Sequence, residues 1–164
     1  MLIRRATPED YATVGVITEA AYEEFLEGPD DPYRRVLRDA ARRDREAELW
    51  VAVGGDGELA GRVTWCPPGS PWRELSDDGE GEFRMLAVAP AARGLGVGEA
   101  LVRHCEQRAR LGGATRMWLS TLDEMVGAQR VYARLGYRHE AARDWDPQPQ
   151  LLPDVHLRAW TKEL

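Results

Sequence analysis

The stretch from Phe83 to Leu101, FRMLAVAPAARGLGVGEAL, decides the fold. Its beginning predicts a strand over residues 82–88, and its end opens a helix over residues 96–111. The predicted helix carries an apolar or small residue at every fourth position, at Val97, Leu101, Cys105 and Ala109. We therefore expect a strand, a glycine-rich loop and an amphipathic helix in succession.

The start of this helix lacks a side chain that would cap it. The first N–H groups of a helix have no partner inside the helix and carry a partial positive charge. Thr7 and Thr121 are placed to cap two other predicted helices, but no Ser, Thr, Asp or Asn stands here. The glycines at 94, 96 and 98 let a ligand approach the backbone, and Arg93 adds a cationic donor. The pattern predicts a phosphate-binding loop; the alternative is a flexible turn before the helix.

Two common phosphate loops do not fit this stretch. A P-loop requires Gly-Lys-Ser/Thr, whereas Gly98 is followed by Glu99 and Ala100, which supply neither the lysine nor the magnesium-binding hydroxyl. A dinucleotide-binding loop places its glycines directly after the first strand, whereas residues 89–92 intervene here. The sequence therefore argues against a nucleoside triphosphatase and a dinucleotide-binding fold.

The remaining elements predict a mixed sheet in a single domain spanning residues 1–164. No internal repeat or linker-like stretch divides the chain. The order of strands and helices is that of an α/β or α+β protein. The predicted segments are a strand at 2–6, a helix from Pro8 to Gly28, a helix at 32–45, a hairpin of strands at 49–53 and 59–65, a loop at 66–81, a strand at 116–121, a helix opened by a capping box at 121–124, and a final strand after Pro153.

Composition narrows the function classes. The 164 residues carry a net charge of −6, which argues against nonspecific binding to nucleic acid because that binding needs an excess of Lys and Arg. No run of roughly 20 apolar residues predicts a membrane span, so we expect a cytoplasmic protein. Cys66 and Cys105 are expected to be reduced thiols, and the scattered histidines show no metal-ligand spacing.

Two motifs resemble those of the GNAT-type N-acetyltransferases. The acetyl-CoA loop of that family, Q/R-x-x-G-x-G/A, is matched by residues 93–98 after the strand residues Leu-Ala-Val at 86–88. The family's closing pattern, N-x-x-A-x-x-x-Y-x-x-x-G-F, is matched by Ala128, Tyr132, Gly136 and Tyr137, while Met125 stands in place of the Asn. The resemblance covers nearly the whole chain and is strongest over residues 82–137.

The resemblance implies a GNAT-like fold and a cofactor site. Its sheet is mostly antiparallel, splayed between strands 82–88 and 116–121, and flanked by about four helices. The pantetheine arm of acetyl-CoA is expected in the gap, paired with the free strand edge as in β-augmentation, and the N–H of Val88 would polarise the thioester carbonyl. The implied cofactor-binding residues are Leu86, Ala87, Val88, Arg93, Gly94, Leu95, Gly96, Val97, Gly98, Ala128 and Tyr132.

Two side chains are candidates for proton transfer to or from the reacting groups. Tyr132 is the candidate acid, because a hydroxyl with an ordinary pKa of ~10 is protonated at neutral pH and can protonate the sulfur of coenzyme A; the alternative is a packed core tyrosine. Glu82 is the candidate base. By strict strand alternation it shares a face with Arg84, Leu86 and Val88; the alternative is a salt bridge to Arg84 or a solvated strand end.

The predicted function is acetyl transfer from acetyl-CoA to a primary amine, by direct attack in a ternary complex. The acceptor is expected to contact the two N-terminal helices and the loop at 66–81. Trp65, Trp72, Asp77 and Asp78 are candidates for a pocket that attracts a cationic amine, or else a tryptophan packed under a loop with exposed acids. The alternative function is a non-catalytic module that binds acyl-CoA as a sensor or interaction domain. The resemblance is also compatible with a homodimer.

Overall fold

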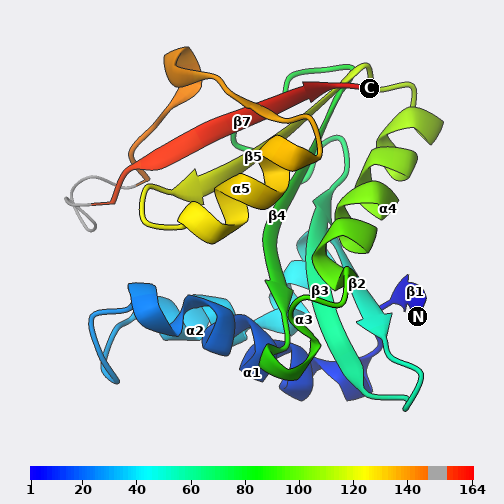
Figure 1. Cartoon of the computed structure of the whole chain (residues 1–164), viewed down its shortest axis with the longest axis vertical. Helices are drawn as coiled ribbons and strands as arrows, with labels where there is room; N and C mark the ends of the chain where they lie inside the picture. The colour runs from blue at the N-terminus through cyan, green and yellow to red at the C-terminus, as the bar shows by residue number, and fades with distance from the viewer. Residues whose placement is uncertain (148–154) are drawn as a thin grey trace.

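The computed structural model describes residues 1–147 and 155–164 (Figure 1). One sheet, in the order β1-β2-β3-β4-β5-β7-β6, runs through the molecule. Its strands are β1 (Leu2–Arg5), β2 (Glu48–Val53), β3 (Leu59–Cys66), β4 (Glu80–Val88), β5 (Arg116–Leu122), β6 (Arg138–His139) and β7 (Leu157–Glu163). The helices are α1 (Tyr11–Tyr22), α2 (Tyr33–Arg38), α3 (Ala40–Glu46), α4 (Val97–Leu111) and α5 (Val126–Arg134), with short 3-10 turns at Pro8–Asp10, Glu23–Phe25, Pro90–Ala92 and Ala141–Arg143.

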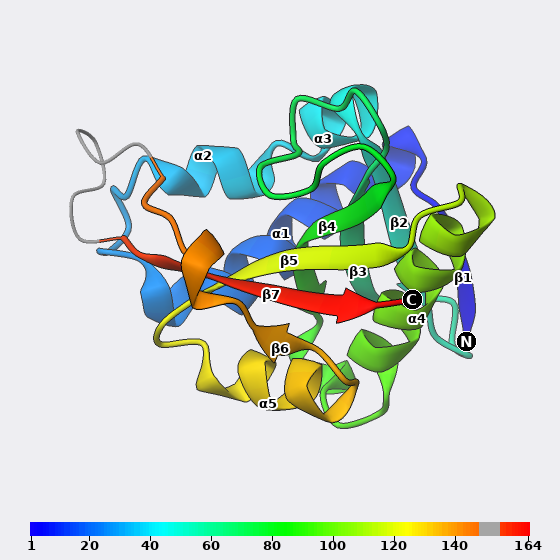
Figure 2. The same ribbon diagram turned by 90° about the horizontal axis from the view of Figure 1, so that it is seen from above.

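The helices form two layers around the sheet. Figure 2 shows α1, α2 and α3 on one face and α4 and α5 on the other. The larger apolar cluster lies beneath α4 and joins Leu101, Val102 and Cys105 of that helix with sheet residues such as Val63 and Phe83. No described helix is long and apolar enough to cross a membrane. The α/β architecture with a mostly antiparallel sheet confirms the predicted fold class.

The two central strands separate after a short stretch of pairing. β4 and β5 are parallel, and only Glu80–Glu82 pair with Arg116–Trp118. Beyond that point the strands diverge (Figure 1), so that the second half of β4 is paired with β3 on one side alone. The predicted splay is thus confirmed, and it leaves a strand edge open beneath α5.

A β-bulge interrupts β4 at its middle. The register between β3 and β4 shifts between Arg62 and Thr64, and Met85 has a φ of 51°. One extra residue in a strand reverses which side chains face which layer. Phe83 and Leu86 therefore both pack toward the α4 layer, whereas Glu82 faces the α1 layer. The prediction that Glu82 shares a face with Leu86 and Val88 is wrong for this reason.

The predicted helix at 32–45 is two helices. Asp39 breaks it with φ −77° and ψ 69°, and its side chain accepts a hydrogen bond from the N–H of Arg42 at 3.0 Å to cap α3. Arg43 of this segment is fully buried and donates to the carbonyls of Val36 and Leu37 at 2.5 and 2.9 Å. These carbonyls end α2 and need donors.

The capping box predicted at Thr121 does not form. Thr121 is a buried residue of β5, and its hydroxyl accepts a hydrogen bond from Trp160 Nε1 at 3.1 Å. The strand continues to Leu122, and α5 begins at Val126 without a side-chain cap. Of the final predicted strand, Leu157 and Ala159 lie in β7, whereas Pro153 lies outside the described residues.

Candidate functional site

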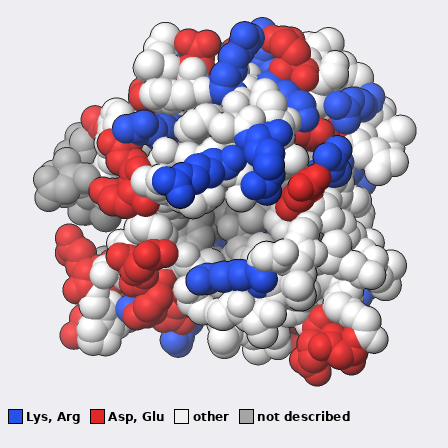
Figure 3. Space-filling view, in the orientation of Figure 1, with Lys and Arg blue, Asp and Glu red and all other residues white. Residues whose placement is uncertain are grey.

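Two adjoining cavities form a groove where β4 leaves β5. The first, of about 400 Å³, reaches the start of α4, and the second, of about 450 Å³, reaches the end of α1; we name them the α4 cavity and the α1 cavity. Figure 3 shows the surface hollowed at this place, with basic side chains over α5 along one edge. Both cavities are lined by the same six residues, namely Leu86, Val88, Arg93, Ala128, Val131 and Tyr132.

The start of α4 presents a row of backbone donors to the α4 cavity. Gly96 precedes the helix and no side chain caps it, as the sequence predicts. Five N–H groups in this stretch have no acceptor among the described residues. They belong to Gly94, Gly96, Val97, Gly98 and Glu99. Donors in this arrangement, at the positive end of a helix, are suited to bind an anion.

The glycines are what distinguish this helix start from that of α5, which is also uncapped. Gly94 and Gly96 each have a φ of 78°, and no atom lies within 4 Å of the position where a Cβ would stand. That backbone conformation is unfavourable for residues with a side chain. The absence of a cap alone therefore does not indicate an anion-binding site. The open glycine turn in front of the unpaired N–H groups is the feature that does.

The open edge of β4 supplies further backbone groups. The N–H of Ala89 donates to the carbonyl of Ala60 at 2.9 Å, across to β3. Because the N–H groups of a strand point alternately to its two sides, the N–H of Val88 points away from β3 into the gap. Leu86, two residues before Val88, presents its N–H and carbonyl on the same side. These are the groups that the sequence interpretation requires for an extended ligand.

Tyr132 lies where the two cavities meet. Its side chain is 7% exposed and packs against the rings of Phe83 and Tyr137, with centroids 6.1 and 6.0 Å away. Burial raises the pKa of the Tyr132 hydroxyl above its ordinary value, since the charged form is disfavoured in an apolar surrounding. The hydroxyl is thus protonated at neutral pH and available as a proton donor.

Glu82 does not line either cavity. Its side chain is buried, and its carboxylate accepts hydrogen bonds at 2.9–3.1 Å from the N–H groups of Glu74, Leu75 and Ser76 and from the Ser76 hydroxyl. It is therefore bound to the loop at 67–79, on the α1 face of the sheet. This geometry supports an anchoring role for the carboxylate and does not bring it to the groove.

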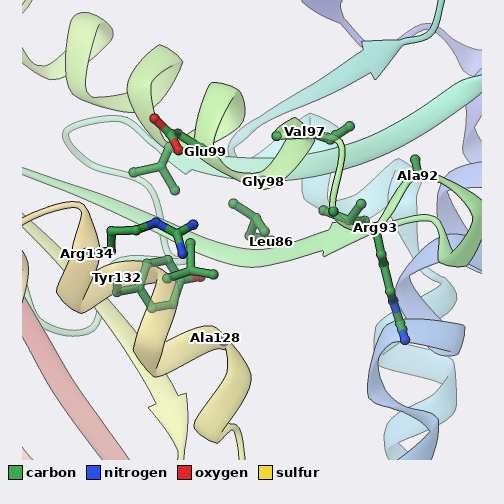
Figure 4. A pocket seen from close by; sticks show the side chains of 14 residues that line it. Leu86, Ala92, Arg93, Val97, Gly98, Glu99, Ala128, Tyr132 and Arg134 are labelled. Carbon is green, nitrogen blue, oxygen red and sulfur yellow. The ribbon is translucent and has the colours of Figure 1, made fainter.

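Charged residues of the groove come from both walls of the α4 cavity. Arg134 of α5 and Glu99 of α4 line it, and Figure 4 shows Arg134 next to Tyr132, with Glu99 above both on α4. Figure 4 also shows Arg93 extending away from Val97 and Gly98 toward the N-terminal helix. Arg134 was not among the residues predicted from the sequence, and its position two residues after Tyr132 does not suggest it, because residues two apart on a helix do not share a face.

The α1 cavity has a different lining from the one predicted for the acceptor. α1 and the turn after it contribute Ala21, Tyr22, Glu24 and Phe25, so the first N-terminal helix borders this cavity. Neither α2 nor the loop at 67–79 lines it. Trp65 is a core residue, Trp72 stacks against Arg42 and Arg84, and Asp77 faces Arg143 at 3.6 Å. The predicted pocket of these residues is therefore not formed.

Comparison with known proteins identifies the family. A model of the acetyltransferase (GNAT) family matches residues 15–137. The chain is 34% identical to a streptothricin acetyltransferase of Streptomyces lavendulae over 109 residues, which are 66% of this chain and 54% of that protein. It is 31% identical to a mycothiol acetyltransferase of Cellulomonas flavigena in an alignment of 149 positions that covers 74% of this chain and 41% of that protein. The chain thus spans about half the length of these relatives.

Solved structures share the fold over the full chain. A GNAT-family acetyltransferase of Staphylococcus aureus Mu50 has a TM-score of 0.73 at 17% identity and covers 99% of this chain and 98% of its own. A Mycobacterium tuberculosis protein, solved in complex with CoA, has a TM-score of 0.69 at 21% identity and covers 100% and 99%. With the family match over three quarters of its length, the chain belongs to the acetyltransferase (GNAT) family.

Proposed function

We propose that this chain transfers the acetyl group of acetyl-CoA to a primary amine, by direct attack of the amine while both substrates are bound. The observation that carries the proposal is the groove itself. Five unpaired N–H groups stand at one end, an open strand edge runs along it, and a protonated tyrosine lies at its centre. Family membership, and the CoA complex of the Mycobacterium tuberculosis neighbour, support the same donor.

We assign the α4 cavity to the nucleotide end of acetyl-CoA. The N–H groups around Gly94, Gly96 and Gly98 would bind its diphosphate, and Arg134 would add a cation from the opposite wall. The residues present fit this ligand, because the turn at Gly94 and Gly96 is open and the N–H groups beside it have no acceptor in the described part of the chain. The pantetheine arm would follow the edge of β4 at Leu86 and Val88, beside Ala128.

We assign proton transfer to the leaving sulfur to Tyr132. As the nitrogen–carbon bond forms and the carbon–sulfur bond breaks, the sulfur gains negative charge and the Tyr132 hydroxyl can donate its proton to it. The N–H of Val88 would stabilise the charge on the carbonyl oxygen. Glu82 stays a prediction as the base, although its carboxylate already binds the loop; Glu24 and Glu124, which line the α1 cavity, are closer to the space an amine would occupy.

The test is a thiol-release assay with purified protein, acetyl-CoA and a panel of amines. Release of CoA that depends on an amine, with the acetylated amine detected by mass spectrometry, is the expected result. Tight binding of CoA without release from any amine would contradict acetyl transfer and favour the acyl-CoA-binding module. A cytoplasmic location and a homodimer remain predictions from the sequence.

A further inference from the structure

The α1 cavity combines a cationic wall with an acidic rim. Arg84 of β4 and Arg93 line it, together with Glu24 and Glu124. The two glutamates are exposed, whereas the Arg84 side chain is only 17% exposed. A ligand that enters this cavity therefore passes carboxylates first and meets a guanidinium inside.

Arg84 is held in a fixed position with part of its donor capacity unused. Its Nη2 contacts Glu74 at 2.8 Å, its Nη1 donates to the carbonyl of Trp72 at 3.3 Å, and its guanidinium lies 5.8 Å from the centre of a Trp72 ring. Its Nε–H has no acceptor among the described residues. A planar guanidinium fixed in this way is suited to bind a carboxylate with directional hydrogen bonds.

A second arginine lies behind this wall without a counter-ion. Arg62 of β3 is fully buried; its Nε donates to Thr18 and its Nη1 to Thr64, at 2.7 and 3.0 Å. Its Nη2 has no hydrogen-bond partner, and no carboxylate of the described residues forms a salt bridge with it. Arg62 and Thr64 are on the same face of β3, and Thr64 is directly opposite Arg84 in the sheet. The guanidiniums of Arg62 and Arg84 therefore lie on one face of the sheet.

The positive charge of these arginines acts on a residue that lines the α1 cavity. Tyr22 lies one helical turn beyond Thr18 and lines the α1 cavity. Burial raises the pKa of its hydroxyl, and the charges of Arg62, Arg84 and Arg43 act in the opposite direction. Of Arg62 and Arg84, only Arg84 has a carboxylate partner among the described residues, namely Glu74, so the charge of Arg62 is left without one. Buried charge that the chain does not neutralise is costly, and a bound anion would neutralise it.

We propose that the acceptor of this enzyme is a primary amine that also carries a carboxylate, which Arg84 binds in the α1 cavity with Arg62 behind it. The inference rests on the proposed function, because it names the substrate class of the same site. The glutamates at the rim would attract the ammonium group, and Arg93 would neutralise the carboxylate from the mouth of the cavity. A polycationic amine would meet repulsion from Arg84 and Arg93.

The experiment compares acceptors that differ only at the carboxylate. L-Phenylalanine, L-phenylalaninamide and 2-phenylethylamine form one set, and the corresponding compounds of leucine and methionine form two more. Thiol release gives kcat/KM for each. We expect the acids to exceed their amides and amines by roughly 10- to 100-fold, the effect of a charge-assisted hydrogen bond. Amides or amines used as well as the acids would overturn the inference and leave acetyl transfer standing.

Variants of Arg84 test whether this residue causes the preference for acids. Arg84→Gln should reduce kcat/KM for the acids to the level of the amides, through KM, with unchanged affinity for CoA, and Arg84→Lys should restore part of it. Arg138→Gln, an exposed arginine of β6 outside both cavities, is the matched control. A preference for acids that survives in a folded Arg84→Gln protein would contradict the assignment, and if that variant does not fold, the wild-type comparison above decides.

If no compound is acetylated, binding decides the inference separately from the proposed function. Isothermal titration of CoA-saturated protein with N-acetyl-L-phenylalanine and with its amide measures the carboxylate preference without turnover. Tighter binding of the acid by roughly tenfold or more supports the inference even where the proposed chemistry fails. Equal binding of the two, or binding of neither, overturns it.

Discussion

The α4 cavity and the α1 cavity meet at Tyr132, yet they are built in different ways. The α4 cavity is made largely of backbone groups and small residues that are consecutive in the chain, at 93–99. The α1 cavity depends on polar side chains that contact partners far away in sequence, such as Arg62 and Thr18, which are 44 residues apart. The first can be read from a short motif, and the second only from the folded chain.

The largest expected effect is the loss of CoA affinity when a side chain is placed in the α4 cavity. Gly96→Glu places a carboxylate where we assign the diphosphate, and like charges in contact cost several kcal/mol, so CoA affinity should fall by at least about 100-fold. Gly113→Glu is the matched control, because Gly113 has the same φ of 78° and equally open space beyond the other end of α4. Both variants should lose similar thermal stability, and only the first should lose CoA binding in titration calorimetry. Retained affinity in Gly96→Glu would show that the loop does not hold the phosphates.

At the junction of the cavities, Tyr132→Phe should lower kcat by about 100-fold, the usual contribution of a general acid, and leave CoA affinity within about threefold. Tyr137→Phe is the control, since its ring packs against Tyr132 but lines neither cavity. Because burial raises the pKa of Tyr132, kcat should show no loss from its ionisation up to about pH 10. An unchanged kcat in Tyr132→Phe would remove it as the acid.

On the α1 side, Glu82→Gln distinguishes an anchor from a base. The amide cannot accept from all four donors of the loop, so we expect a loss of about 2–3 kcal/mol in the free energy of unfolding, measured in urea. kcat at saturating substrate should change little, and its dependence on pH should keep its shape. Glu124→Gln removes an exposed carboxylate of the α1 cavity, which Glu82 does not line, and should leave stability unchanged. A folded Glu82→Gln protein with kcat lowered about 100-fold would restore Glu82 as the base.

The smallest effect concerns the outer wall of the α4 cavity. Arg134→Gln should weaken CoA binding by about fivefold at low salt, and less as salt screens the charge. Arg138→Gln, four residues on and outside the cavity, should not change it. Equal effects of the two variants would mean that the basic side chains over α5 act only through their summed field.

Much of the α4 side could be predicted from the sequence. The strand, the glycine turn and α4 follow from local patterns, because periodicity and glycine placement act over a few residues. The choice of Tyr132 came from the match to the closing pattern of the GNAT family, and not from helix periodicity alone. The capping box at Thr121 was wrong because β5 continued and used that hydroxyl for Trp160; a tertiary contact overrode a local preference.

The α1 side could not be predicted in the same way. The bulge at Met85 reverses which face of the sheet the following side chains of β4 lie on. No local sequence pattern predicts a single extra residue in a strand. The roles of Glu82 and Arg62 depend on partners in a loop and in α1, which only the folded chain brings to them. Of the residues that suggested an acceptor pocket, Trp65 instead packs in the core, Trp72 lies against two arginines, and Asp77 faces Arg143.

A crystal structure of this chain with bound CoA tests the central claim most directly. We predict that the diphosphate accepts hydrogen bonds from the N–H groups between Gly94 and Glu99, with the pantetheine arm along Leu86 and Val88. CoA bound elsewhere, or those N–H groups paired with acceptors of the chain itself, would contradict the account.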